Sequence, residues 1–176
     1  MLKRLPGWRL ILLLLLLSSL SATGRAQRDH LTEQETDLVR EEQALDRRTA
    51  IFIKAIERRL LVISDPQAAV SKQAKKDAEK WGELPKGTRA ELLWDIAKIL
   101  DEAIVNIDDT AARNPQSPLL PKALHNLADA STRFLGQLTP LRDSAQGRER
   151  EALEQAIENA QSIIEAAKKV PPPAKK

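Results

Sequence analysis

The two histidines are the first residues to consider, because many hydrolytic, metal and haem sites use this side chain. His30 lies just after a predicted signal peptide, where we expect a mobile segment. His125 precedes Asp129 by four residues on a predicted helix, a spacing that allows an ion pair or a shared metal ion. The Glu-x-x-His pairs of di-iron bundles are absent, so we interpret His125 as a surface residue and predict no metal site.

Other catalytic and cofactor patterns are also missing. The only methionine is Met1 and there is no cysteine, which leaves no haem attachment motif. The serines form no nucleophile motif, and the glycines form no phosphate-binding loop. Asp108 and Asp109 are adjacent, so on a helix their side chains point about 100° apart. We therefore predict a protein that is not an enzyme and that needs no cofactor.

Two arginine pairs, Arg47-Arg48 and Arg58-Arg59, form the most distinctive charged pattern. They are 11 residues apart, which is about three helical turns and would align four guanidinium groups on one side. Such a ladder could bind an anionic partner such as a phosphate-bearing glycan or a lipid headgroup. The alternative is a solvated face in which neighbouring carboxylates neutralise the arginines. Those carboxylates belong to Glu41, Glu42, Asp46 and Glu57.

The N-terminus has the three-part pattern of a signal peptide. Three basic residues precede an unbroken Leu and Ile run at 10–17, which matches the roughly 7 to 15 apolar residues of a signal peptide. A membrane-spanning helix needs about 20. Gly24 and Ala26 suggest cleavage before Gln27; cleavage after Ala22 or Gly24, or an uncleaved anchor, are the alternatives. We predict a signal peptide at 1–26, an exported protein in the periplasm or secreted, and no stable membrane span after cleavage.

The charge of the expected mature chain is balanced. Residues 1–26 hold 4 of the 28 Lys and Arg and none of the 25 Asp and Glu, which leaves 24 − 25 = −1. This balance gives no reason to expect nucleic-acid binding. A lysine run between positions 72 and 80 contains Asp77 and Glu79, so we expect a solvated helix face there.

Apolar spacing predicts helices throughout the mature chain and no strand. Thr32 with Glu35, and Thr88 with Glu91, have the spacing of capping boxes. The sequence predicts an all-α antiparallel bundle of about four main helices plus one short polar helix. We expect this bundle to form a single domain at 27–169, followed by a flexible Pro/Lys-rich tail at 170–176. The expected helices span 29–63, 65–81, 88–114, 120–141 with an interruption at Pro140, and 144–169.

The first expected helix would be about 50 Å long and would overhang its partners. Leu31, Leu38 and Leu45 recur every seven residues along it, as in a coiled-coil seam. This half could pair with a second copy or another envelope protein, or it could pack on the short helix of the same chain.

These observations predict an exported helical-bundle protein that acts by protein binding or scaffolding in the cell envelope. The alternative is a bundle that binds an apolar or anionic small ligand between its helices. The candidate partner-binding residues are Leu31, Leu38, Leu45, Arg47, Arg48, Arg58 and Arg59.

Overall fold

The computed structural model describes residues 29–65, 67 and 71–173. The predicted signal peptide at 1–26 lies outside the described residues, as does the end of the predicted tail at 174–176. Within the described ranges all regular structure is helical, which confirms the predicted all-α class. The elements are α2 (Glu33–Glu41), α3 (Leu45–Ser64), α4 (Lys72–Trp81), α5 (Arg89–Arg113), α6 (Leu119–Leu138), the short 3-10 helix η3 (Thr139–Leu141) and α7 (Gly147–Ala167).

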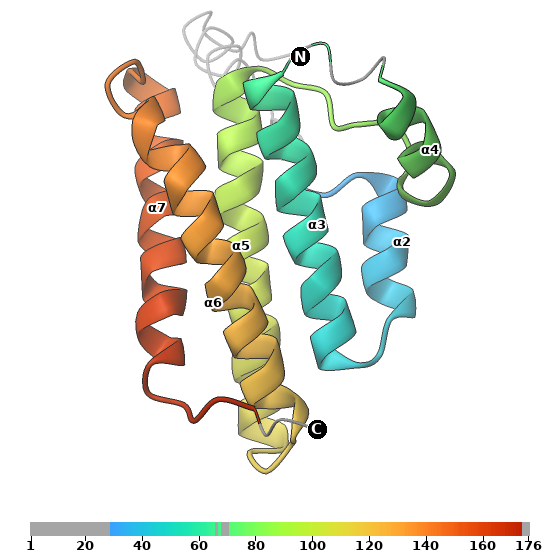
Figure 1. Cartoon of the computed structure of the whole chain (residues 1–176), viewed down its shortest axis with the longest axis vertical. Helices are drawn as coiled ribbons and strands as arrows, with labels where there is room; N and C mark the ends of the chain where they lie inside the picture. The colour runs from blue at the N-terminus through green and yellow to red at the C-terminus, as the bar shows by residue number, and fades with distance from the viewer. Residues whose placement is uncertain (1–28, 66, 68–70, 174–176) are drawn as a thin grey trace, which may run out of the picture.

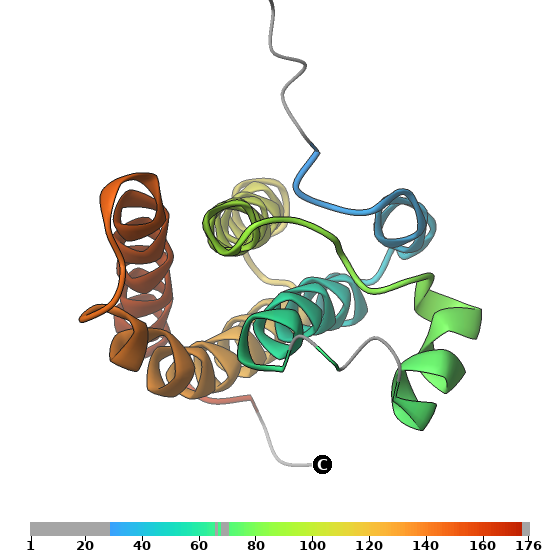
Figure 2. The same cartoon turned by 90° about the horizontal axis from the view of Figure 1, so that it is seen from above.

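Four of these helices, α3, α5, α6 and α7, form the bundle (Figure 1). Consecutive bundle helices run in opposite directions, as predicted. Each of α3 and α7 packs on both α5 and α6, whereas α5 and α6 face each other across the bundle. The view from above places α2 and α4 together on the outer side of α3 (Figure 2).

The core is a single aliphatic cluster with two aromatic residues, Phe52 and Phe134. An apolar stripe of α5, from Leu93 to Ile107, is buried along its length, and α7 presents Leu153, Ala156 and Ile157 to the same core. Burying a large aliphatic side chain contributes about 1.5–3 kcal/mol, so these stripes supply most of the driving force for the bundle. None of the described helices is both long enough and apolar enough to cross a membrane.

The prediction of one long first helix over 29–63 is wrong. The chain leaves the helical conformation at Glu42 and re-enters it after Ala44, so α2 and α3 form a helical hairpin. Leu31 and Leu45, at the two ends of the predicted seam, are each 7% exposed and belong to the core. Folding α2 back buries both leucines within one chain, which a straight helix with an overhang would not do. The three leucines therefore do not share one helix: Leu31 precedes α2, half-buried Leu38 lies on α2, and Leu45 begins α3.

Side chains stabilise the turn between α2 and α3 in place of glycine or proline. The Ala44 amide donates a hydrogen bond to Glu42 Oε1 at 2.9 Å, and Gln43 Nε2 donates to the Arg40 carbonyl at 3.2 Å. Arg48 Nε donates to the Glu42 carbonyl at 2.8 Å. These contacts satisfy backbone groups that a helix end leaves without partners.

Helix α4 begins later than predicted and packs less closely on the bundle than the other helices. Its N-cap is Ser71, whose hydroxyl accepts a hydrogen bond from the Ala74 amide at 3.0 Å. Gly82 ends the helix with a φ of 68°, a conformation that favours glycine. A Cβ at this position would lie 3.2 Å from Gln34 Cβ, so Gly82 also permits the close approach of α2.

Substituting Asp46 should change the acid sensitivity of the fold. Lys122 Nζ lies 2.5 Å from Asp46 Oδ2, and this hydrogen bond between α6 and α3 lowers the pKa of the carboxyl despite partial burial. The pair therefore contributes its full stabilisation at pH values above the ordinary Asp pKa of about 3.9. This contribution is lost as the pH falls through the lower pKa of the folded state.

We expect Asp46→Asn to reduce stability by about 0.5–1 kcal/mol at pH 7, since Lys122 is half exposed and Asp46 also lies in the first turn of α3. Thermal unfolding followed by circular dichroism from pH 2 to pH 7 measures this. The difference from the wild type should vanish at the acid end. Asp109→Asn is the control, because Asp109 pairs with Arg113 on an exposed face of α5. A difference that persists unchanged at pH 2 would contradict the assignment.

Candidate functional site

Two adjacent arginines of α3, Arg58 and Arg59, are buried between the bundle and the outer helices. They are 4% and 1% exposed. The preceding turn places Phe52, Ala55 and Ile56 in the bundle core, so the two long side chains emerge toward α2, α4 and α5. Buried charges are stable only when they are paired and hydrogen-bonded. The partners of these arginines define the geometry of the site.

Arg59 joins α2 and α5 to α3. Its Nη1 and Nη2 atoms bind Glu35 Oε1 and Oε2 at 3.1 and 2.9 Å, a two-point pair with a fully buried carboxylate. Its Nε atom lies 3.4 Å from Asp95 Oδ2 on α5. Nη2 and Nη1 also donate hydrogen bonds to the carbonyls of His30 and Ala55, at 2.5 and 2.8 Å respectively.

Arg58 holds the end of α4. Its guanidinium donates to the carbonyls of Trp81, Gly82 and Glu83, the Gly82 bond being 3.1 Å long. Its Cζ atom lies 5.9 Å from the centre of the Trp81 ring, within the range of a cation–π contact. The side chain thus caps the C-terminus of α4, where helix carbonyls carry partial negative charge.

The two arginines share the carboxylate of Glu35. Arg58 Nε lies 3.5 Å from Glu35 Oε1, the oxygen that also accepts from Arg59. Burial lowers the pKa of Arg58 most, the Glu35 carboxylate opposes that shift, and the neighbouring Arg59 charge adds to it. An arginine remains charged despite such a shift because its ordinary pKa lies far above neutral pH. One carboxylate therefore links the α2 anchor to the α4 anchor.

Glu35 has a second role that the sequence did predict. Its Oε2 atom accepts from the Thr32 amide at 3.0 Å, and the Thr32 hydroxyl accepts from the Glu35 amide at 3.2 Å. This confirms the predicted capping box at the start of α2. The same side chain caps its helix and binds both arginines.

A groove of about 340 Å³ lies between α3 and α4, with Arg58 among its lining residues. Lys54 on α3 and Asp77 on α4 form an ion pair at 3.4 Å beside it. Leu61 also lines the groove and is 41% exposed, unusually high for a large apolar side chain of this protein. The remaining lining residues are Glu57, Asp65, Ser71, Ala74, Gly82 and Leu84.

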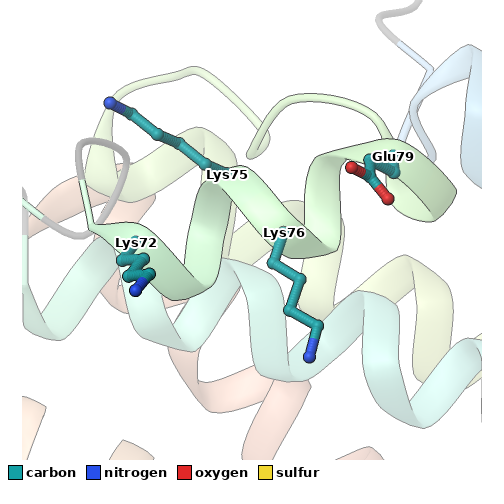
Figure 3. A pocket seen from close by; sticks show the side chains of 4 residues that line it. All are labelled: Lys72, Lys75, Lys76 and Glu79. Atoms are coloured by element: carbon teal, nitrogen blue, oxygen red, sulfur yellow. The ribbon is translucent and has the colours of Figure 1, made fainter.

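The outward side of α4 carries a shallow recess lined by Lys72, Lys75, Lys76 and Glu79 (Figure 3). Lys72 and Lys76 point to one side of the helix and Lys75 points to another. The recess is an open surface that belongs to a single helix. Helix α4 therefore separates the groove from a basic outer face.

The other predicted site residues are dispersed. Arg47 is exposed and lies 3.2 Å from Glu42, whereas Arg48 Nη1 donates to Asn106 Oδ1 at 3.0 Å. The four arginines therefore do not form one ladder: only Arg47 has the solvated, carboxylate-paired surroundings of the alternative interpretation. Arg58 and Arg59 lie inside the protein instead, which follows from the hairpin that brings Glu35 over them.

The histidines also differ from expectation. His30 is docked on α5, where its Nε2 atom lies 2.7 Å from Glu102 Oε2 and its ring meets Trp94 edge-on at 6.4 Å. His125 Nε2 lies 3.0 Å from the Val170 carbonyl, so it links α6 to the start of the tail. Among the described residues, no group of three or more His, Asp or Glu side chains is arranged to hold a metal ion.

Sequence reasoning missed Asp95 and the groove. A signal for Asp95 is present, because this carboxylate lies on the apolar face of α5 beside Leu92 and Ile96, all of them buried. A charge in such a stripe indicates a buried partner of opposite sign. The groove has no comparable signal, since it depends on how far α4 stands from α3.

Comparison of the chain with protein families, with curated proteins and with solved structures found no significant match. The geometry of the site is therefore the basis for a functional proposal.

Removing the Arg59 charge should strongly destabilise the protein. Arg59→Met leaves Glu35 and Asp95 buried with much of their compensating charge gone, and breaking a buried pair in this way costs about 3–5 kcal/mol. Adding Glu35→Gln should recover part of this loss, because glutamine keeps the capping contact without the charge. Urea unfolding of both variants measures the effect.

The control is Arg40→Met, which removes an exposed partner of Asp37 and should reduce the free energy of unfolding by less than about 0.5 kcal/mol. An equal loss in Arg59→Met and Arg40→Met would exclude a central role for the buried cluster.

Removing the Arg58 charge should release α4 while the bundle remains folded. Arg58→Met takes away the donor for three carbonyls at the end of α4, whereas Glu35 keeps its two-point pair with Arg59. We expect trypsin to cleave after the α4 lysines about tenfold faster under native conditions, since local opening becomes easier. Arg133→Met is the control, because Arg133 pairs with Glu57 on the surface. Unchanged cleavage in Arg58→Met would show that α4 is held by other contacts.

Proposed function

We propose that this chain is an exported, non-enzymatic helical-bundle protein that acts by binding another protein in the cell envelope, and that the partner binds in the groove between α3 and α4. The observation that carries the proposal is the groove itself, in which a helix separate from the bundle leaves Leu61 accessible beside charged groups. Export rests on the N-terminal sequence pattern.

The lining of the groove has the composition of a protein interface. Leu61, Ala74 and Leu84 provide apolar surface, and Lys54, Glu57 and Asp65 surround it with charge of both signs. Protein interfaces combine an apolar centre with a polar rim in the same way. Partner charges could pair with this rim without entering the bundle core.

The buried arginines support this proposal by fixing the walls of the groove. Arg58 holds the end of α4 in place, and the Lys54–Asp77 pair joins the two walls. A site whose walls are fixed before binding loses less conformational entropy when a partner is bound. Scaffolding through a seam on one long helix has less support, because Leu31 and Leu45 are core residues.

Binding of an anionic small ligand is the second candidate function. The groove volume of about 340 Å³ lies at the lower end of the range for small-molecule sites, about 300–1,000 Å³, and Arg58 lines it. However, the Arg58 guanidinium already donates to three carbonyls, and Glu35 lies beside it. A ligand would have to compete with these contacts, which favours a protein partner that uses the accessible Leu61.

Site-specific cross-linking tests the proposal. A photoreactive amino acid replaces Leu61 in one variant and Val105 in another, the latter being 54% exposed on α5 and serving as the matched control. In the cells that produce the protein, we expect a discrete adduct with one partner from position 61 and none from position 105. The purified partner should then bind the Leu61→Asp variant about tenfold more weakly than the wild type, as for an interface anchor. Identical adducts from both positions, or unchanged affinity of the Leu61→Asp variant, would refute binding in the groove.

A further inference from the structure

The outward face of α4 carries a concentration of positive charge that the described structure does not neutralise. Four exposed lysines and two carboxylates lie on this ten-residue helix, and Asp77 turns toward α3 to pair with Lys54. Glu79 is left as the one carboxylate of α4 beside the lysines. We call the surface formed by these lysines the α4 lysine face; its residues are Lys72, Lys75, Lys76 and Lys80.

Most lysines elsewhere on the described surface have a close acidic neighbour, although exposed Lys169 does not. Lys86, Lys98 and Lys168 each lie within about 3.2 Å of a carboxylate three residues away. No ion pair joins a lysine of the α4 lysine face to a carboxylate in the described ranges, although Lys80 lies over the Trp81 ring at 5.6 Å. The α4 lysine face is therefore an exception in a mature chain whose net charge is about −1.

We propose that the α4 lysine face binds an acidic polypeptide segment of the partner. This inference rests on the proposed function, because α4 is one wall of the groove and a protein filling the groove would extend over the helix. The charge of the face complements a segment rich in Asp and Glu. Electrostatic complementarity of this kind speeds association and selects among partners.

The spacing of the lysines suits a polypeptide. Lys72, Lys76 and Lys80 follow one another at four-residue intervals, so their Cα atoms rise about 6 Å per step along the helix. Carboxylates four residues apart on a partner helix have the same rise, and alternate residues of an extended chain are about 6.6 Å apart. Several ion pairs can therefore form at once with either conformation.

A lipid surface fits the same face less well. Lys75 and Lys80 project from α4 about 140° apart, and Figure 3 shows Lys75 directed away from Lys72 and Lys76, so a flat bilayer would meet only part of the face. The lysine face also has no large apolar side chain that could enter the lipid, as interfacial helices require. A segment of protein can instead follow the curved surface of the helix.

A charge-matched pair of variants tests the proposal. One variant changes all four lysines of the α4 lysine face to Gln. The control changes four exposed basic residues of or next to α7 to Gln and so alters the net charge equally: Arg148, Arg150, Lys168 and Lys169. The probes are a fluorescent synthetic helical peptide with glutamate at every fourth position, the same peptide with glutamine in place of glutamate, and vesicles containing anionic phospholipid. Binding is measured by fluorescence anisotropy or by sedimentation, at several salt concentrations.

We expect the wild type to bind the glutamate peptide, with an affinity that falls as salt rises, and not the glutamine peptide. The α4 variant should bind about tenfold more weakly, since each exposed ion pair contributes a factor of about two, and the α7 control should stay within about twofold of the wild type. Equal weakening in both variants, no binding of the peptide, or tighter binding to the vesicles would overturn the proposal.

The proposed function and this inference can fail separately. Leu61→Asp should leave binding of the glutamate peptide unchanged, because Leu61 lies in the groove and not on the α4 lysine face. Cross-linking at position 61 could identify a partner that binds the α4 variant as tightly as it binds the wild type. That result would refute the inference and leave the groove proposal standing. Loss of peptide binding in Leu61→Asp would contradict this separation of the two surfaces.

Discussion

The buried pair between Glu35 and Arg59 is the interaction on which the outer part of the molecule depends. Two charges that are almost fully removed from water must remain together, because separating them inside the protein costs several kcal/mol. The pair holds α2 against α3, and the ion pair of Arg59 with Asp95 extends the constraint to α5. The hairpin turn at 42–44 is compatible with the sequence, but this pair explains why α2 folds back onto the bundle.

The neighbouring residue, Arg58, transmits the same constraint to α4. It shares Glu35 with Arg59 and donates to the carbonyls at the end of α4, so a single turn of α3 positions two outer helices. The four-helix bundle provides a rigid support that is filled by aliphatic side chains. The features that suit recognition, the groove with Leu61 and the α4 lysine face, both depend on the helix that Arg58 holds. This division of roles explains why binding is proposed on the outer side of α3 and not within the bundle.

Local signals predicted part of the site. The capping box of Thr32 and Glu35 was visible, yet it revealed only half of what Glu35 does. The arginine pairs stood out, but their alignment along one straight helix assumed no interruption after Glu41. The residues at 42–44 contain neither glycine nor proline, and the side-chain contacts that stabilise the turn form only once the chain has folded back. Asp95 was detectable in principle, as a charge within an apolar stripe.

Local patterns in the sequence suffice to predict the helical class, the bundle and most helix boundaries, because apolar spacing and caps act over a few neighbouring residues. The α5 stripe and the end of α6 before Pro140 are examples. The packing of the helices against one another is what buries Arg58 and Arg59, brings Leu31 and Leu45 into one core, and leaves a groove between α4 and α3. These features depend on pairing between groups far apart in the chain, such as Glu35 and Arg59, which are 24 residues apart, and local periodicity carries no information about such pairs.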